Sequence, residues 1–309
     1  MHIEVLKVFC DLAETGSFSL AASRNFVTQS AVSQQIRTLE DRYGRELVER
    51  SKGRMKLTQA GQILYQAGKE IIQKYHTIEE SLQTLSRVIS GSIRVATVNS
   101  VGLYEIIAPL KKYLRAFPAV NVRLEYARVN KIYEGVSRGE VDLGLVAYPT
   151  KRQQILSTAF REDRLVLICA PQHPFAQATE LPIGRLSGEN FVGFERDVPT
   201  RRALDKIFHK HGVKVQYVME VDNVETIKRA VEIGSGISIV PEPCIEQEVK
   251  TYTLRALQFK DEILLRPLGI LSKRGRPYSP AVRKFIEFLT EKDARPIAVG
   301  VRDGVSAAD

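Results

Sequence analysis

Hydrophobic side chains recur with a helical period between residues 28 and 43. They follow one another at steps of four, three and four, at Val32, Ile36, Leu39 and Tyr43. These steps place the four side chains on one face of a helix. Side chains that can form hydrogen bonds occupy a second face, at Ser30, Ser33, Gln34 and Arg37. The pattern predicts an amphipathic helix whose polar face meets either water or a binding partner.

Two shorter helical patterns come before this helix. The first has its apolar face at Val5, Phe9, Leu12 and Ala13. Ser17 or Ser19 can cap the second, whose residues 20 to 22, Leu-Ala-Ala, allow close contact between helices. Asn25 tolerates the left-handed backbone of a tight turn, and Thr28 can cap the following helix. Helix, turn and helix in this order can present a second helix to the major groove of DNA, although an ordinary helical hairpin has the same spacing.

Basic residues alternate along the segment that follows, ERSKGRMKLT. Arg50, Lys52, Arg54 and Lys56 fall within seven residues, with Gly53 between them. Alternating basic side chains around a glycine predict a β-hairpin wing that reaches DNA phosphates. A charged run is more often only a solvated surface, but this one follows a candidate recognition helix. The whole chain has 45 Lys and Arg against 36 Asp and Glu, a net charge of +9 that favours a polyanionic partner.

This part of the chain resembles the winged helix-turn-helix domain of LysR-type transcriptional regulators. The resemblance covers GSFSLAASRNFVTQSAVSQQIRTLEDRYGRELVERSKGRMKLTQAG, in which the Ala-Ala pair, TQSAVSQQIRTLE and LTxAG stand at the family's spacing. It implies that bases are read by Gln29, Ser30, Ser33, Gln34 and Arg37. It implies that phosphates are contacted by Thr28, Arg50, Lys52 and Arg54. Val48 departs from the family, which usually has Phe there beneath the wing.

The chemistry of these side chains agrees with base reading. Gln pairs bidentately with adenine and Arg with guanine, and each pair contributes about 1–3 kcal/mol of discrimination. Ser is tolerant of several bases. We therefore predict that the polar face contacts double-stranded promoter DNA.

Residues 59 to 89 predict one long helix without proline. Apolar side chains recur at steps of three or four, at Leu64, Ala67, Ile71, Tyr75, Ile78, Leu82, Leu85 and Ile89. This heptad-like seam either packs on its own domain or pairs with a second chain. The family resemblance implies a homodimer through residues 59–89 and a homotetramer built from such dimers. A two-fold protein also suits a palindromic operator.

From Ser92 onward, apolar strand patterns alternate with helical patterns. Near-continuous apolar strands joined by helices predict parallel sheets that are covered on both faces. Two such units in succession predict two α/β lobes, with crossover strands near residues 163–170 and 263–271 and a last helix covering the first lobe. This region resembles the two-lobed regulatory domain of the same family, which has the fold of periplasmic solute-binding proteins.

The expected fold class is an N-terminal all-α winged helix-turn-helix with a long linker helix, followed by an α/β two-lobed regulatory domain of periplasmic-binding-protein type. The expected boundaries are 1–58 for the DNA-binding domain, 59–89 for the linker and dimerisation helix, 90–295 for the effector-binding domain and 296–309 for a flexible tail. Within the effector-binding domain, lobe I is predicted at 92–163 and 268–292, and lobe II at 164–267.

An effector site is predicted beyond the carboxyl ends of the strands, where helix N-termini offer free N–H groups. The residues at these places are Asn99, Ser100, Arg128, Ala147, Thr200 and Arg202. The resemblance implies effector pockets at the positions around Ser100 and Thr200. Arg128 and Arg202 favour a small anion as the ligand, although each Arg alone is more commonly explained by a surface salt bridge.

The remaining sequence features narrow the function. The three cysteines, Cys10, Cys169 and Cys244, are expected to be reduced core thiols of a cytoplasmic protein. No secretory signal, membrane span, catalytic motif, metal site or cofactor is expected. The sequence thus predicts a sequence-specific DNA-binding transcriptional regulator whose promoter binding or bending responds to a small anionic effector. Two alternatives stay open: an architectural DNA binder without an effector, and a cytosolic small-molecule-binding protein or enzyme.

Overall fold

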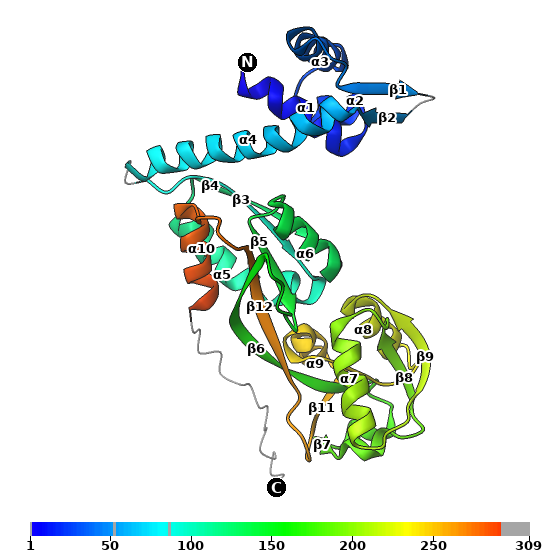
Figure 1. Ribbon diagram of the computed structural model, residues 1–309. Coiled ribbons are helices and arrows are strands. Elements are labelled where there is room, and N and C mark those ends of the chain that lie inside the picture. Colours follow the sequence, from blue (N-terminus) through cyan, green and yellow to red (C-terminus); the bar gives the residue numbers. More distant parts are fainter. Residues whose placement is uncertain (1, 52–53, 86–87, 292–309) are drawn as a thin grey trace, which may run out of the picture. The chain divides into compact units, whose positions relative to one another are not determined.

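The computed structural model describes residues 2–51, 54–85 and 88–291. The chain divides into two compact units, one ending at Val88 and the other beginning at Ile89 (Figure 1). We describe each unit by itself. Lys52 and the predicted tail at 296–309 lie outside the described residues. Within the described residues, no helix is both long and apolar enough to cross a membrane.

The N-terminal unit has the predicted three helices, hairpin and long helix. Its elements are α1 (Ile3–Thr15), α2 (Phe18–Arg24), α3 (Gln29–Tyr43), β1 (Val48–Ser51), β2 (Arg54–Leu57) and α4 (Gln59–Leu85). Two predicted caps are confirmed. The Ser17 side chain accepts a hydrogen bond from the backbone N–H of Leu20, and Thr28 accepts one from Ala31. These caps satisfy N–H groups that would otherwise be unpaired at the starts of α2 and α3.

The core of this unit forms where α1, α2 and α3 meet. Val32, Ile36 and Leu39 are buried there, as the helical period predicts. Tyr43, the fourth residue of the predicted apolar face, is 45% exposed, so this part of the prediction was wrong. The reason is that α3 ends at Tyr43, next to the left-handed Gly44, where the core no longer covers it. Val48 is itself buried in the core.

Contacts to the segment before β1 fix the hairpin to α3 and the start of α4 to the hairpin. One carboxylate oxygen of Glu40 on α3 accepts hydrogen bonds from the N–H groups of Leu47 (2.9 Å) and Val48 (3.3 Å). The Thr58 hydroxyl donates to the carbonyl of Glu46 (2.7 Å). At Gly61, a Cβ atom would lie 2.1 Å from the Leu47 carbonyl oxygen. Only glycine permits this close approach of α4 to the segment that leads into β1.

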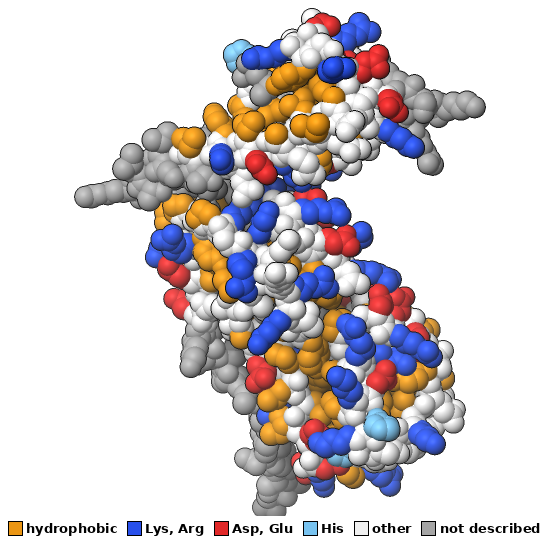
Figure 2. All heavy atoms as spheres, viewed as in Figure 1, with side chains coloured by type: hydrophobic (Ala, Val, Ile, Leu, Met, Phe, Trp, Pro, Cys, Tyr) orange, Lys and Arg blue, Asp and Glu red, His pale blue; other side chains and the backbone are white. Residues whose placement is uncertain are grey.

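Hydrophobic side chains remain exposed along α4 (Figure 2). The exposed fractions are 68% for Ile63, 44% for Ile71, 37% for Tyr75 and 58% for Ile78. Leu64, from the same predicted seam, instead packs partly buried against the unit's own core. The side chains of Leu82 and Leu85 lie outside the described residues. The helix was predicted to reach residue 89, but α4 ends at Leu85, and Ile89 belongs to the second unit, where it packs against that unit's core, so its place on the seam was wrong. The first part of the seam therefore packs within its own unit, whereas the part further along α4 is an exposed apolar surface.

The second unit contains two lobes. The elements of lobe I are β3 (Gly91–Thr97), η1 (Val101–Glu105), α5 (Ile107–Ala116), β4 (Val120–Tyr126), α6 (Val129–Arg138), β5 (Leu143–Ala147) and α10 (Pro280–Thr290). The main elements of lobe II are β7 (Glu180–Leu181), β8 (Asn190–Phe194), α7 (Pro199–Lys210), β9 (Gln216–Val221), α8 (Val224–Glu232), β10 (Ser238–Pro241), α9 (Glu246–Lys250) and β11 (Arg255–Phe259). Two longer strands, β6 (Ile155–Cys169) and β12 (Leu265–Lys273), join the lobes.

The sheets combine parallel and antiparallel strands. β3 pairs in parallel with β4 and β5, and β8 pairs in parallel with β9. β12 pairs antiparallel with β5 and β6, and β10 and β11 pair antiparallel with β6. The predicted parallel pairing is therefore confirmed for β3 with β4 and β5 and for β8 with β9, but the prediction did not include the antiparallel pairing of the crossover strands. β6 leaves lobe I and β12 returns to it, so the two crossover strands must run in opposite directions.

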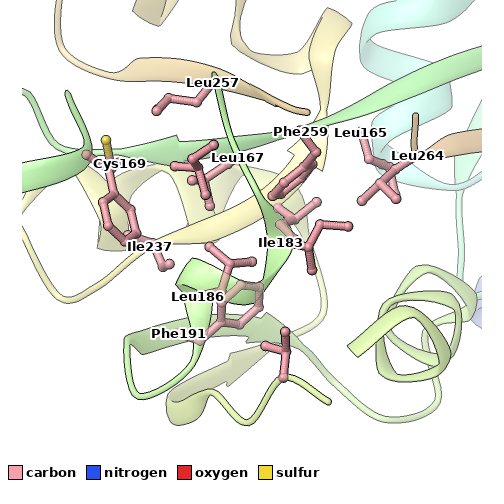
Figure 3. Close-up of a cluster of buried hydrophobic side chains, with 14 of the residues drawn as sticks. Leu165, Leu167, Cys169, Ile183, Leu186, Phe191, Ile237, Leu257, Phe259 and Leu264 are labelled. Carbon is pink, nitrogen blue, oxygen red and sulfur yellow. The ribbon is translucent and has the colours of Figure 1, made fainter. Parts of the chain in front are cut away.

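Each lobe has its own hydrophobic core. In lobe I, α10 packs on α5, with the rings of Tyr113 and Phe285 5.0 Å apart, which confirms that the last helix covers this lobe. Figure 3 shows the lobe II core, where Leu167 of β6 lies among residues such as Leu186 and Phe191. The cysteines, Cys10, Cys169 and Cys244, are free and buried. Burial raises the pKa of Cys10 to about 12 and that of Cys169 to about 11, so both stay as unreactive thiols at neutral pH.

Candidate DNA-binding surface and effector site

α3 presents the predicted base-reading side chains on its outer face. Gln29, Ser30, Gln34 and Arg37 are exposed and Ser33 is half-buried. Thr28, predicted to contact phosphate, lies 2.9 Å from Ser30, oxygen to oxygen. Because Val32, Ile36 and Leu39 are buried on the opposite face, the polar face is held outward by core packing.

The turn before α3 is held by hydrogen bonds and carries an unusual residue. Backbone N–H groups of Phe26 and Val27 donate to the carbonyls of Ser23 (3.4 Å) and Ala22 (3.1 Å), a pairing that commonly closes a helix with glycine. Phe26 occupies the glycine position with φ +55°, and its side chain is 97% exposed. Asn25 has φ −103°, so its predicted left-handed conformation was wrong. The left-handed backbone costs a non-glycine residue roughly 1–2 kcal/mol.

The predicted wing is present as the antiparallel hairpin of β1 and β2. Its register pairs Val48 with Leu57 and Ser51 with Arg54. Arg50 lies on β1 and Arg54 on β2, but the side chains of both lie outside the described residues, as does the whole of Lys52. Their contact with phosphate therefore stays a prediction.

The predicted effector residues lie at the ends of the strands and at the starts of the helices of both lobes. Asn99 and Ser100 follow β3, Ala147 ends β5, Arg128 precedes α6, and Thr200 and Arg202 lie in the first turn of α7. Ala147 and Thr200 are buried, Asn99 and Ser100 are half-buried, and Arg128 and Arg202 are exposed. α7 starts without a side-chain cap, so N–H groups of its first turn have no capping side chain.

A buried ion pair lies between the crossover strands. Arg266 and Asp163 are directly paired in register, and the Arg266 Nε donates to both carboxylate oxygens, at 2.8 and 3.1 Å. Arg266 Nη1 also donates to the Ser100 hydroxyl at 2.9 Å. Burial alone would lower the pKa of Arg266, but the hydrogen bonds and charge of Asp163 raise it above its usual value. The guanidinium therefore stays charged and holds Ser100 in place.

A second network joins the lobes around the buried Lys228 of α8. Its ammonium donates to the Tyr104 hydroxyl (2.7 Å) and forms ion pairs with Glu225 (3.1 Å) and Glu248 (2.9 Å). Tyr104 belongs to lobe I and also donates to Glu225. Burial, with a further contribution from this hydrogen bond, raises the pKa of Tyr104 to about 12. The tyrosine thus stays protonated and links lobe I to α8.

An exposed ion cluster joins the lobes around Arg128. Its guanidinium lies 3.0 Å from Glu195, 3.1 Å from Asp197 and 3.6 Å from Asp222, all in lobe II. Three carboxylates around one guanidinium give the surface around Arg128 a net negative charge, which disfavours an anion bound directly to Arg128. The neighbour of Arg202 in α7, Arg201, is also engaged, because it donates to Asp205, Glu220 and the carbonyl of Phe194.

Sequence reasoning did not identify the buried charges at Asp163, Lys228 and Arg266. A signal was present for Lys228, which shares the apolar face of its helix with Val224, Ile227 and Val231. A charged residue is seldom fully buried without a partner, so its place on this face indicated an ion pair. Arg266 follows the run ILL in the sequence, but its partner lies 103 positions away and could not be inferred.

A winged helix-turn-helix followed by a two-lobed unit of this kind defines a class of effector-responsive, DNA-binding transcriptional regulators. Residues 3–62 match the family described as bacterial regulatory helix-turn-helix protein, lysR family, and residues 86–294 match the LysR substrate binding domain. The chain therefore belongs to the LysR family of transcriptional regulators.

Relatives and solved structures agree with this family. The RuBisCO operon transcriptional regulator of Allochromatium vinosum is 31% identical over 299 residues, covering 96% of this chain and 98% of that protein. Full-length OxyR from Pseudomonas aeruginosa has a TM-score of 0.71 at 20% identity, covering 94% and 93% of the two chains, and shows the shared fold. The Synechocystis CcmR regulatory domain, in complex with 2-PG, has a TM-score of 0.60 at 26% identity, covering 65% of this chain and 96% of that one.

The buried pair Arg266–Asp163 predicts a stability effect that depends on removing one charge or both. Arg266→Met should destabilise the chain by about 3–5 kcal/mol, because it leaves the Asp163 carboxylate buried without a partner. The double variant Arg266→Met/Asp163→Leu should recover most of this loss, since both charges leave together. Chemical denaturation measures the free energy of unfolding of the single and the double variant. A single variant that costs less than about 1 kcal/mol would contradict the buried-pair interpretation.

Proposed function

We propose that this regulator reads its operator through the exposed face of α3 and holds the DNA backbone through the hairpin wing. The observation that carries the proposal is the division of α3 into a buried apolar face and an exposed face bearing Gln29, Ser30, Gln34 and Arg37. Gln and Arg supply the bidentate donors and acceptors that distinguish adenine and guanine. Thr28, Arg50, Lys52 and Arg54 supply the phosphate contacts, which position the protein without reading sequence.

Substitutions in α3 and in the wing should affect binding in different ways. Arg37→Ala should reduce the preference for operator over random DNA by about 5- to 150-fold, since one bidentate contact contributes about 1–3 kcal/mol. Arg54→Ala should weaken binding to all DNA and reduce the salt slope by about one unit. The measurement is fluorescence-anisotropy titration over a salt series, on a duplex selected from a genomic fragment pool at about 150 mM salt, where non-specific binding is weak.

The matched control is Arg185→Ala, which removes an exposed arginine from the regulatory unit and should leave both quantities unchanged. Equal losses on operator and random DNA for both test variants would refute the division of roles. A pool that yields no preferred sequence would refute base reading altogether and favour an architectural DNA binder.

We propose that two chains pair through α4 and that dimers associate into a tetramer. Ile71, Tyr75 and Ile78 lie at steps of four and three and are all substantially exposed, which supports an apolar contact with a second chain. A dimer also brings two copies of α3 to a palindrome, so the contacts of one recognition helix are doubled.

A charge placed in the exposed part of this seam should separate the chains. Ile78→Glu introduces two buried carboxylates into the proposed two-fold contact, so the protein should shift to a smaller species in sedimentation velocity and lose cooperative operator binding. Ile263→Glu, at a residue 63% exposed in a loop of the regulatory unit, is the control and should keep the native size. A native sedimentation coefficient for Ile78→Glu would exclude α4 as the dimer contact.

We propose that a small anionic effector binds between the lobes near Asn99, Ser100, Ala147, Thr200 and Arg202. The uncapped first turn of α7 and the nearby positive charge of Arg202 support an anion there. The 2-PG ligand of the CcmR regulatory domain supports the same class of effector. Arg128, surrounded by carboxylates, would act in this scheme by holding the lobes together. Effector binding changes lobe closure and thereby promoter binding or bending, provided that the two states bind the effector unequally.

Loss of the Thr200 hydroxyl should weaken the response to the effector. Thr200→Val keeps the shape of the buried side chain but removes a donor to the anion, so the half-maximal concentration of 2-PG that alters operator affinity should rise about 10- to 100-fold. Thr158→Val, on an exposed position of β6, is the control and should respond as the native protein does. A parallel titration with inorganic phosphate tests whether a simple oxyanion alters operator affinity in the same way. A native response of Thr200→Val would remove this residue from the site.

A further inference from the structure

The exposed ring of Phe26 is not explained by the folding of its own unit. Because the side chain is 97% exposed, it contributes almost no packing to the core. The residue also holds a left-handed backbone, with φ +55°, at a helix end where glycine or asparagine would be less strained. A strained residue that gains no contact within the chain points to a contact outside it.

Phe26 lies directly before the surface that is proposed to read bases. Thr28 caps α3 two positions later, and Gln29 and Ser30 are exposed in the first turn. The N-terminal residues of a recognition helix are those that reach base edges in the major groove. The groove offers an aromatic ring one distinctive apolar group, the C5 methyl of thymine.

We propose that Phe26 packs against thymine methyl groups at the edge of the site read by α3, and so adds a preference for thymine to the operator. This inference rests on the proposed base reading by α3. The contact of Phe26 differs in its chemistry from those of Gln29 and Arg37, because the ring recognises an apolar group by packing and forms no hydrogen bond. The strained turn fixes the direction of the Cα–Cβ bond of Phe26 before DNA is bound.

Replacement of thymine by deoxyuridine removes only the C5 methyl group and therefore tests the contact directly. Operator duplexes selected by the native protein carry deoxyuridine at each thymine position in turn, and affinity is measured by fluorescence anisotropy. We expect the native protein to bind about three- to fivefold more weakly where the replaced methyl contacts Phe26, as expected for one buried methyl group.

Phe26→Asn is the main test variant because asparagine suits the left-handed turn and preserves the fold. It should bind the unmodified operator more weakly and show no response to deoxyuridine at the positions that affect the native protein, as a double-mutant cycle requires. Phe26→Gly is the second variant, since glycine adds no hydrogen-bonding group that could replace the ring. Both variants should give the same pattern.

Tyr252→Asn is the matched control. Tyr252 also holds a left-handed backbone, with φ +60°, after α9 in the regulatory unit, and its side chain is 66% exposed. The backbone N–H groups of Tyr252 and Thr253 donate to Val249 and Glu248, as their counterparts do at Phe26. The substitution thus makes the same change at the same kind of turn, and it should leave operator affinity and the deoxyuridine response native.

Two results would overturn the thymine contact while base reading by α3 stands. One is a deoxyuridine response that is equal in native and Phe26→Asn proteins. The other is native operator affinity of both Phe26 variants; if promoter activity is then lost, the ring faces a protein partner instead of DNA. Base reading and the thymine contact would both be overturned by one pair of results. In that case the fragment pool yields no preferred sequence, and the Arg37→Ala variant binds DNA as the native protein does.

Discussion

Both lobes of the regulatory unit depend on one pair of antiparallel strands and on the ion pair buried between them. β6 and β12 pass from one lobe to the other, and Arg266 faces Asp163 directly across their ladder. Separation of the two charges has a high free-energy cost, because each would lose its partner without being hydrated in exchange. Arg266 also holds Ser100 of lobe I, so the same guanidinium fixes the strands and the start of the proposed effector site. Lobe movement must therefore take place around this pair.

The other contacts between the lobes differ in how much they resist such movement. Lys228 is buried and has both of its carboxylate partners within lobe II, whereas the cluster around Arg128 crosses between the lobes and is exposed and screened by salt. Movement of the lobes would leave the ion pairs of Lys228 intact and would break only the two hydrogen bonds of the Tyr104 hydroxyl, each worth about 1.5–3 kcal/mol because its partner is charged. An effector commonly supplies a coupling free energy of about 1–3 kcal/mol. It can therefore rearrange the exposed Arg128 cluster more readily than it can break both hydrogen bonds of Tyr104, so the contact of Tyr104 with α8 would serve as the pivot.

Local features of the fold could be predicted from the sequence, and long-range ones could not. The caps at Ser17 and Thr28 and the buried face of α3 depend on neighbours within one helical turn, and these predictions are confirmed. The directions of β6 and β12 depend on how the chain returns between lobes, which the apolar pattern does not record. The partnership of Arg266 with Asp163 requires the strand register as well. The candidate base-reading face was therefore predictable, but the charges that fill the region between the lobes were not.

The turn before α3 shows how a tertiary contact overrides a local preference. Asparagine is favoured in left-handed turns, yet the Asn25 amide donates to the Asp11 carboxylate (2.8 Å) and to the carbonyl of Ala21 (2.9 Å). These bonds tie the end of α2 to α1 and keep Asn25 outside the left-handed region. The left-handed conformation then falls on the next residue, Phe26. The anchor that orients α2 beside α1 is thus also the cause of the strain at Phe26, and it sets the direction in which the Phe26 side chain leaves the backbone next to the recognition helix.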